Sequence, residues 1–487
     1  MYLGIDIGTS AVKAAVIDDT GAIADQASAP LGVSRPHPLW SEQNPADWWS
    51  ATNSAVCHLR LPVRKGVRAI GLSGQMHGAT LLDKNRRVLR PAILWNDGRS
   101  AKQCIEFESA VPDARRITGN LAMPGFTAPK LLWVRLNEPK IFAATAMVLL
   151  PKDYVRLCMT GDTASDMSDS AGTLWLDVAK RRWSETMLAG TGLDLSHMPA
   201  LFEGNEITGE LRAELADAWG MSRVPVVVAG GGDNAAGAIG AGVVRPGDGF
   251  LSLGTSGVLF LANDGYRPNP EGGVHTFCHA VPKRWHQMSV ILSAASCMDW
   301  AARICGLGST SALFEAAEKR NEPAASEIFL PYLSGERTPH NDPNAQGVLF
   351  GLTQETSAPC VAQAVLEGVA FAFRDGMDAL LGSGAVIDSL SVIGGGARSF
   401  YWGKILSSVL RRPLTYRDSG AVGPAYGAAR LARMAFEHAS VEDICTPPAI
   451  LHVAQPDDRL SDVYMQKMSR YRSLYQHLKG LFLETRI

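Results

Sequence analysis

The stretch that decides the fold is Leu3-Gly-Ile-Asp-Ile-Gly-Thr-Ser-Ala-Val-Lys-Ala-Ala-Val-Ile17. Apolar residues alternate on both sides of Gly8, Thr9 and Ser10, which predicts two strands joined by a tight turn. Such a turn leaves backbone N–H groups and hydroxyls pointing outward, where they can hold phosphate oxygens. Asp6 stands just before the turn, where it can hold a metal ion, and Lys13 follows it. An ordinary structural hairpin would carry the same residues, because short glycine-rich motifs also match by chance.

A second copy of the pattern favours the functional interpretation. It reads Gly249-Phe-Leu-Ser-Leu-Gly-Thr-Ser-Gly-Val-Leu-Phe-Leu-Ala262, about half of the 487-residue chain further on. A repeat of this period predicts two duplicated domains, with the two Gly-Thr-Ser turns facing each other across a cleft. Ser252 stands where the first copy has Asp6, so only one half supplies a carboxylate. Phosphoryl transfer needs such positioning and charge neutralisation, together with a base for the attacking hydroxyl.

Composition narrows the function classes. The chain is 46% hydrophobic and 19% charged with a net charge of -2, so no basic surface points to nucleic acid or an anionic membrane. The eight cysteines are scattered without metal-ligand spacing, which predicts reduced thiols. No signal peptide and no apolar run of membrane-spanning length is recognised, so we expect a cytoplasmic protein.

A second carboxylate lies in the stretch Val224-Pro-Val-Val-Val-Ala-Gly-Gly-Gly-Asp-Asn234, which predicts a buried strand that runs through glycines into a helix. The glycines let a substrate approach the backbone closely, and Asp233 is then a natural proton acceptor for its hydroxyl. The glycines also imitate a dinucleotide fingerprint. That interpretation fails because Asp233 inside the turn would repel a pyrophosphate, and no P-loop motif is present.

Further polar segments follow predicted strands. Gln75 and His77 lie in a glycine-flanked segment after a buried strand, and their neutral groups suit hydroxyls and carbonyls better than phosphates. The glycines in Ser389-Leu-Ser-Val-Ile-Gly-Gly-Gly-Ala-Arg-Ser399 can lie against a nucleoside. Asp166 and Asp169 are candidate ligands in a polar segment. The small residues from Ser289 to Cys305 predict a helix.

Taken together, the motifs resemble those of the FGGY carbohydrate kinases of the actin/hexokinase/Hsp70 superfamily, over essentially the whole chain. Within that family the sequence is most similar to members that phosphorylate D-xylulose. The residues that carry the resemblance are Gly4-Ile-Asp-Ile-Gly-Thr-Ser10, Ser34-Arg-Pro-His-Pro-Leu-Trp-Ser-Glu-Gln43, Ser73-Gly-Gln-Met-His-Gly78, Ile93-Leu-Trp-Asn-Asp-Gly-Arg99, Ala229-Gly-Gly-Gly-Asp-Asn234, Leu253-Gly-Thr-Ser-Gly257 and Leu333-Ser-Gly-Glu-Arg-Thr-Pro-His340.

The resemblance implies an α/β fold of two duplicated ribonuclease H-like (actin-like ATPase) domains, each a mixed sheet flanked by helices, with a cleft between them. We expect the domains at residues 1–243 and 244–487. The implied reaction converts D-xylulose and ATP to D-xylulose 5-phosphate and ADP, with Mg²⁺ as cofactor. A homodimer is compatible with the resemblance.

The same resemblance implies roles for individual residues. Asp233 would be the general base, and Asp6 would hold Mg²⁺ directly or through water. The other implied residues are Met76, His77, Asp233 and Asn234 for the sugar, Gly8, Thr9, Ser10, Lys13, Gly254 and Thr255 for the phosphates, and Gly395, Gly396 and Ser399 for the nucleoside.

Two alternatives stay open at this point. One is a kinase of the same family for another sugar or polyol, such as L-ribulose, L-fuculose or L-xylulose. The other is a sugar sensor on the same fold without catalytic activity. The presence of Asp233 and of both phosphate hairpins argues against a sensor.

Overall fold

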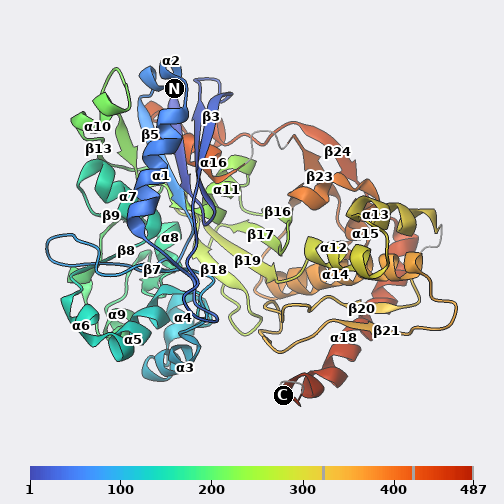
Figure 1. Ribbon diagram of the computed structural model, residues 1–487. Coiled ribbons are helices and arrows are strands. Elements are labelled where there is room, and N and C mark those ends of the chain that lie inside the picture. Colours follow the sequence, from blue (N-terminus) through green and yellow to red (C-terminus); the bar gives the residue numbers. More distant parts are fainter. Residues whose placement is uncertain (321–323, 419–422, 485–487) are drawn as a thin grey trace.

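The computed structural model describes residues 1–320, 324–418 and 423–484 (Figure 1). The strands are β1 (Tyr2–Ile7), β2 (Ala11–Ile17), β3 (Ile23–Pro30), β4 (Glu42–Gln43), β5 (Ala69–Gly74), β6 (Thr80–Leu82), β7 (Ala92–Ile93), β8 (Met147–Leu149), β9 (Ala164–Asp166), β10 (Leu176–Asp177), β11 (Arg182–Trp183), β12 (Ala200–Phe202), β13 (Ile207–Glu210), β14 (Val226–Val228), β15 (Gly231–Gly232), β16 (Asp248–Leu253), β17 (Gly257–Asn263), β18 (His275–Cys278), β19 (Trp285–Ile291), β20 (Ile328–Leu330), β21 (Val348–Phe350), β22 (Ser389–Ile393), β23 (Leu414–Arg417) and β24 (Ile450–Ala454).

The helices complete an α/β architecture. They are α1 (Pro45–His58), α2 (Leu61–Lys65), α3 (Ala101–Ala110), α4 (Ala114–Thr118), α5 (Thr127–Asn137), α6 (Pro139–Ala144), α7 (Pro151–Thr160), α8 (Met167–Ala171), α9 (Glu185–Thr191), α10 (Ala213–Ala218), α11 (Asp233–Ala241), α12 (Ala295–Ile304), α13 (Thr310–Lys319), α14 (Ala358–Leu381), α15 (Phe400–Leu410), α16 (Pro424–Glu437), α17 (Val441–Ile444) and α18 (Asp458–Glu484), with short 3₁₀ turns at Leu195–His197 and Gly395–Arg398.

Two large mixed sheets have matching topology. The first runs in the order β13-β14-β5-β1-β2-β3, with β15 beside β5, and the second runs in the order β18-β19-β17-β16-β22-β23-β24. In each sheet the phosphate-type hairpin (β1–β2 or β16–β17) is antiparallel, and its first strand lies parallel to β5 or β22. The strands β14 and β23 continue each sheet in the parallel sense, and β13 and β24 close it antiparallel. The duplication predicted from the two Gly-Thr-Ser motifs is therefore confirmed.

The first hairpin forms as the alternation of residues predicts. Every residue of β1 is buried, because this strand is central in the sheet and both of its faces are covered. The Gly8 N–H donates to the Ala11 carbonyl at 3.0 Å and closes the turn. Asp6 and Lys13 are direct cross-strand partners, so their side chains lie on the same face of the hairpin.

The predicted helix from Ser289 to Cys305 is wrong in its first part. Residues 289–291 belong to β19 and pair there with β17, and α12 begins only at Ala295. The β-branched Val290 and Ile291 favour a strand, and pairing with β17 decided the conformation.

One helix from late in the chain packs on the first sheet. In Figure 1, α16 lies beside β5 and α11 rather than with α15 and α18. A β-carbon added to Gly4 or Gly71 would overlap the carbonyl oxygens of Ala425 or Ala428 on this helix, so glycine is needed for the close approach. The predicted division of the chain between residues 243 and 244 stays a prediction.

Each large sheet carries its own apolar core. One core gathers around β1, β2 and β5 with α1, and another surrounds α14. A third joins α5 and its neighbours to Phe250, Phe260 and Phe277 of the second sheet. The structure forms no disulfide among the eight cysteines, all of which lie in its described residues. Among the described residues, no helix combines the length and apolar character needed to cross a membrane.

Candidate active site

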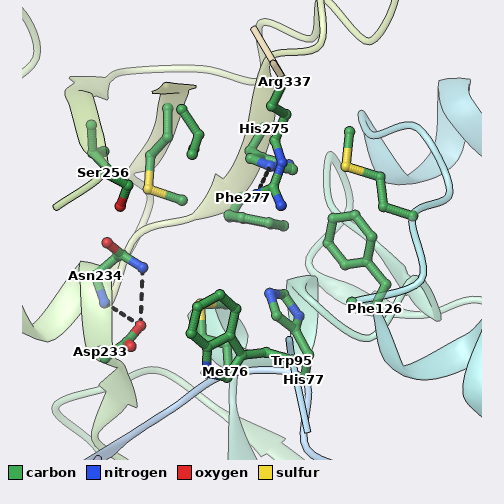
Figure 2. A pocket seen from close by; sticks show the side chains of 15 residues that line it. Met76, His77, Trp95, Phe126, Asp233, Asn234, Ser256, His275, Phe277 and Arg337 are labelled. Atoms are coloured by element: carbon green, nitrogen blue, oxygen red, sulfur yellow. Dashed lines mark hydrogen bonds between the residues drawn. The ribbon is translucent and has the colours of Figure 1, made fainter. Parts of the chain in front are cut away.

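A cavity of about 240 Å³ lies where the two halves of the chain meet. The first half contributes Met76, His77, Trp95, Met123, Gly125, Phe126, Asp233 and Asn234, and the second half contributes Ser256, Val258, His275, Phe277, Met288, Val290 and Arg337 (Figure 2). Aromatic and sulfur-containing side chains form most of the wall, with a few polar groups between them. Such a lining is typical of a small-molecule site.

Asp233 is the first residue of α11, and it follows the short strand β15. Its Oδ1 accepts hydrogen bonds from the backbone N–H of Asn234 at 2.7 Å and from the Asn234 amide at 3.0 Å. Burial, and then the charge of the nearby Asp6, raise the pKa of Asp233 to about 7. A carboxylate with a pKa near neutrality can take up a proton at physiological pH.

His77 reaches the cavity from the segment that follows β5. Its Nδ1 lies 2.6 Å from the Gly172 carbonyl oxygen, so Nδ1 carries the proton and donates it. Burial, with the charge of Lys130 as the next cause, lowers the pKa of His77 to about 3. The ring is therefore neutral, and Nε2 is left as an acceptor. This agrees with the prediction that the segment suits hydroxyls and carbonyls.

The backbone of His77 is held by a buried lysine. His77 has a φ of 69°, in the left-handed region that side chains other than glycine rarely adopt. The Lys130 ammonium donates to the His77 carbonyl at 2.9 Å and to the Gly125 carbonyl at 2.7 Å. Thr127 Oγ1 donates to the same His77 oxygen at 3.2 Å. These bonds fix the backbone at His77 and thereby the direction of its side chain.

A second cavity, of about 570 Å³, meets the first at Asp233 and Asn234. Phe250, Phe400, Tyr416 and Leu451 give it an apolar wall, and Gly394 and Gly395 give it a backbone wall. Gly394 has a φ of 92° and approaches Leu253 closely, which requires glycine. Gly395 also lines this cavity, whereas Gly396 and Ser399 are not among its lining residues. The Ser399 hydroxyl accepts from the Trp402 N–H and caps α15.

Side chains from neighbouring segments support the turn of the first hairpin by hydrogen bonds. Thr9 Oγ1 donates to Gln75 at 3.0 Å and accepts from the Trp95 indole at 3.0 Å, so its hydroxyl already has partners. Gln75 in turn donates to Gln43. Among the described residues, the backbone N–H groups of Thr9 and Ser10 donate to no other group of the chain. The turn therefore offers backbone donors to a ligand.

The turn of the second hairpin is anchored through its carbonyl groups. The Gly254 and Thr255 carbonyls accept from the N–H groups of Ala295 and Ala294, each at 2.9 Å, at the start of α12. Thr255 and the neighbouring Ser256 are exposed. Ser256 lines the smaller cavity, which the sequence motif did not foretell.

Asp6 fits a magnesium site by its chemistry. Its carboxylate is buried with Oδ1 lacking a hydrogen-bond partner among the described residues. Burial raises the pKa of Asp6 to about 6, and the Ser73 hydroxyl and then the charge of Lys13 oppose the shift. Mg²⁺ typically takes one or two carboxylates and completes its shell with water and phosphate oxygens. Lys13 itself is exposed and lines a different hollow, beside Gly423 and Pro424.

Asp166 and Asp169 are not available to a ligand in this structure. Both are fully buried and surround the Lys152 ammonium, at 2.9 and 3.5 Å, together with Asp153 at 2.5 Å. Although burial opposes it, these carboxylates raise the pKa of Lys152. Asp166 also accepts from Ser168 Oγ, which in turn accepts from the Gly232 N–H at 3.1 Å. The cluster therefore supports the loop that carries Asp233.

Several cavity residues were not predicted from the sequence. Trp95 and Arg337 lie inside motifs quoted in the sequence analysis, and their place in those motifs is the sequence signal that could have identified them. His275 and Phe277 lie on β18, whose sequence carried no motif, and only the pairing of β18 with β19 brings them to the cavity.

The comparisons with known proteins agree over the whole chain. Residues 1–240 match the FGGY family of carbohydrate kinases, N-terminal domain, and residues 249–436 match the C-terminal domain of that family. The xylulose kinase of Escherichia coli (strain K12) is 55% identical over 483 residues, which cover 99% of this chain and 100% of that protein.

Solved structures show the same fold. A structure described as a xyloylose kinase from Brucella ovis has a TM-score of 0.95 and 50% identity, and xylulose kinase from Rhodospirillum rubrum has a TM-score of 0.92 and 27% identity, each over 99% of both chains. The predicted fold class, with its pair of duplicated actin-like ATPase domains, is confirmed. The chain belongs to the FGGY family of carbohydrate kinases.

Proposed function

We propose that this chain transfers the γ-phosphoryl group of ATP to the 5-hydroxyl of D-xylulose, giving D-xylulose 5-phosphate and ADP. The observation that carries the proposal is the meeting of two cavities at Asp233. The smaller cavity has the size and lining for a sugar, and the larger has a glycine turn and apolar walls suited to a nucleoside. The names of the relatives described above support D-xylulose as the sugar.

Asp233 acts as the general base in this proposal. Asn234 occupies Oδ1, which leaves Oδ2 for the hydroxyl of the substrate. As the hydroxyl oxygen attacks the γ-phosphorus, its proton passes to Oδ2. A pKa of about 7 allows the carboxylate to be ionised before the reaction and to accept the proton during it.

The sugar is held by neutral groups. His77 Nε2 accepts from one of its hydroxyls, since Nδ1 is committed to Gly172. Met76 and Asn234 line the same cavity and contribute an apolar contact and an amide. Phe126 and Phe277 exclude water from the remaining surface, which protects the transferred group from hydrolysis.

The phosphates are held between the two hairpins. Gly8, Thr9, Ser10 and Lys13 approach from the first half, and Gly254 and Thr255 from the second. Asp6 would hold Mg²⁺, which would supply positive charge to neutralise the phosphates. Gly395, Gly396 and Ser399 belong to the turn that lies against the nucleoside.

The test is ADP release by the purified protein with a panel of D-xylulose, L-xylulose, L-ribulose, L-fuculose and glycerol. We expect the highest kcat/KM with D-xylulose. An equal or better rate with another member of the panel would replace D-xylulose by that sugar and leave the kinase assignment intact. Sugar binding by calorimetry without any ADP release would support the sensor alternative instead.

The role of Asp233 has its own test. Asp233→Ala should lower sugar phosphorylation by at least about 10³-fold, since base catalysis and substrate positioning are lost together. Asp264→Ala, an exposed aspartate on the rim of the second sheet, serves as the matched control. Unchanged phosphorylation by Asp233→Ala would remove Asp233 as the base.

A further inference from the structure

Arg337 brings a cation into the smaller cavity from the second half of the chain. Figure 2 shows its guanidinium beside His275, on the opposite side of the cavity from Asp233. No step of the proposed phosphoryl transfer uses it. Arg337 is half-buried, and a partly desolvated charge that lines a sugar-sized cavity is well placed to bind a polar ligand.

The backbone around Arg337 is fixed to β19. The Arg337 N–H donates to Glu336 Oε1 at 2.7 Å, and the same oxygen accepts from the Leu292 N–H at 3.0 Å. The Thr338 N–H donates to the Val290 carbonyl at 3.1 Å, and Thr338 Oγ1 accepts from the Val290 N–H at 3.0 Å. These bonds on both sides of Arg337 hold it rigidly, as specificity requires.

The guanidinium itself is only partly satisfied. Nη1 lies 3.3 Å from His275 Nε2 and donates to it, and His275 Nδ1 lies 3.3 Å from Asn120 Oδ1. Within residues 1–320, 324–418 and 423–484, no carboxylate lies within ion-pair distance of Arg337, and the neighbouring Glu336 is turned toward backbone N–H groups. A guanidinium has five N–H donors and no acceptor, so the remaining donors are free to bind acceptor oxygens of a ligand in the cavity.

His77 supplies a hydrogen-bond acceptor that complements the donors of Arg337. Its Nε2 is an acceptor without a proton, so the cavity presents a donor from the second half and an acceptor from the first. An α-hydroxyketone matches this pair, because its carbonyl oxygen can only accept and its hydroxyl can donate. An alditol has a hydroxyl in place of the carbonyl and matches the guanidinium less well.

We propose that Arg337 determines specificity for ketoses by donating to the substrate carbonyl oxygen at C2, while the far end of the substrate lies against Asp233. This inference rests on the proposed sugar kinase activity and adds the feature of the substrate that is recognised. It assigns Arg337 to substrate selection, with no part in proton transfer.

The test compares D-xylulose with D-arabinitol, which differ only by reduction at C2, in the wild type and in Arg337→Met. Loss of a charge-assisted hydrogen bond should lower kcat/KM for D-xylulose about 10- to 100-fold. The value for D-arabinitol should fall much less, so the ketose preference should drop about 10-fold or more. Arg337→Lys keeps a charged donor and should retain an intermediate preference.

Two controls separate this role from a structural one. Arg303→Gln changes an exposed arginine of the same half and should leave both substrates unaffected. His275→Phe removes the side-chain partner of Arg337 but keeps an aromatic ring beside Phe277, and it should preserve the ketose preference.

Equal losses for the two substrates, or an unchanged preference in Arg337→Met, would overturn the proposal. If Arg337→Met does not fold, Arg337→Lys decides, and an unchanged preference in that variant overturns it as well. If the wild type acts on a different ketose, that ketose and its alditol take the place of the pair. A wild type that prefers the alditol would refute the role of Arg337 and leave the kinase activity standing.

Discussion

Asp233→Asn should make the ligand-free protein more stable at the same time as it removes activity. Asparagine keeps the shape of the side chain and its Oδ1 acceptor for Asn234, but it carries no charge. The native carboxylate has a pKa of about 7, against 3.8 for an unperturbed aspartate, because it is buried near Asp6. Ionising it in the folded protein therefore costs free energy that asparagine does not.

The magnitude follows from the shift. A difference of about 3 pKa units corresponds to about 4 kcal/mol at pH 8. Water reaches Asp233 from the two cavities, so we expect about half of this, about 2 kcal/mol. The folded pKa is raised, so the favourable contribution of the protonated carboxyl is complete below about pH 4 and is lost as the pH rises through about 7. The advantage of asparagine should therefore grow between pH 5 and pH 8.

The assay is urea unfolding of the ligand-free wild type and variant at pH 5, 6, 7 and 8. Asp264→Asn is the control, because the hydrogen bond from Arg267 lowers the pKa of that exposed aspartate and its substitution should give no gain. A variant that is no more stable than the wild type at pH 8, or that is equally stabilised at pH 5 and pH 8, would refute the reasoning.

Three further predictions concern packing, positioning and motion. Gly71→Ala should destabilise the protein by about 3 kcal/mol in urea unfolding, because the added β-carbon overlaps the Ala428 carbonyl, whereas Gly32→Ala meets no atom within 4 Å and should change little. Lys130→Met should raise the KM for the sugar about 10-fold and leave the KM for ATP unchanged, because it removes the shorter of the two side-chain hydrogen bonds to the His77 carbonyl; equal effects on both would contradict this. The two halves should close on binding sugar together with a non-hydrolysable ATP analogue, so identical X-ray scattering curves with and without the ligands would count against closure.

The elements with strong local signals were predictable from the sequence. The two hairpins show a period of two on either side of Gly-Thr-Ser, and the structure pairs them in equivalent places of two matching sheets. Asp233 could be singled out because glycines bring the backbone of a buried strand directly into a helix. In both cases the local pattern and the tertiary fold agree.

The features that could not be predicted from the sequence depend on contacts between segments that lie far apart in the chain. His275 and Arg337 share a hydrogen bond across 62 positions because both segments pack on β19. The Thr9 hydroxyl is engaged by Gln75 and Trp95, so the turn presents mainly its backbone, a distinction that a motif cannot make. Residues 289–291 looked helical by composition and became strand through their neighbours.

The position of α16 has a consequence for how the protein is made. Synthesis proceeds from the N-terminus, so β1, β2 and β5 leave the ribosome long before the helix that packs against Gly4 and Gly71. Until residue 437 has emerged, that face of the first sheet lacks a native cover. For most of its translation, the nascent chain therefore exposes the sheet face around Gly4 and Gly71, which is open to non-native contacts.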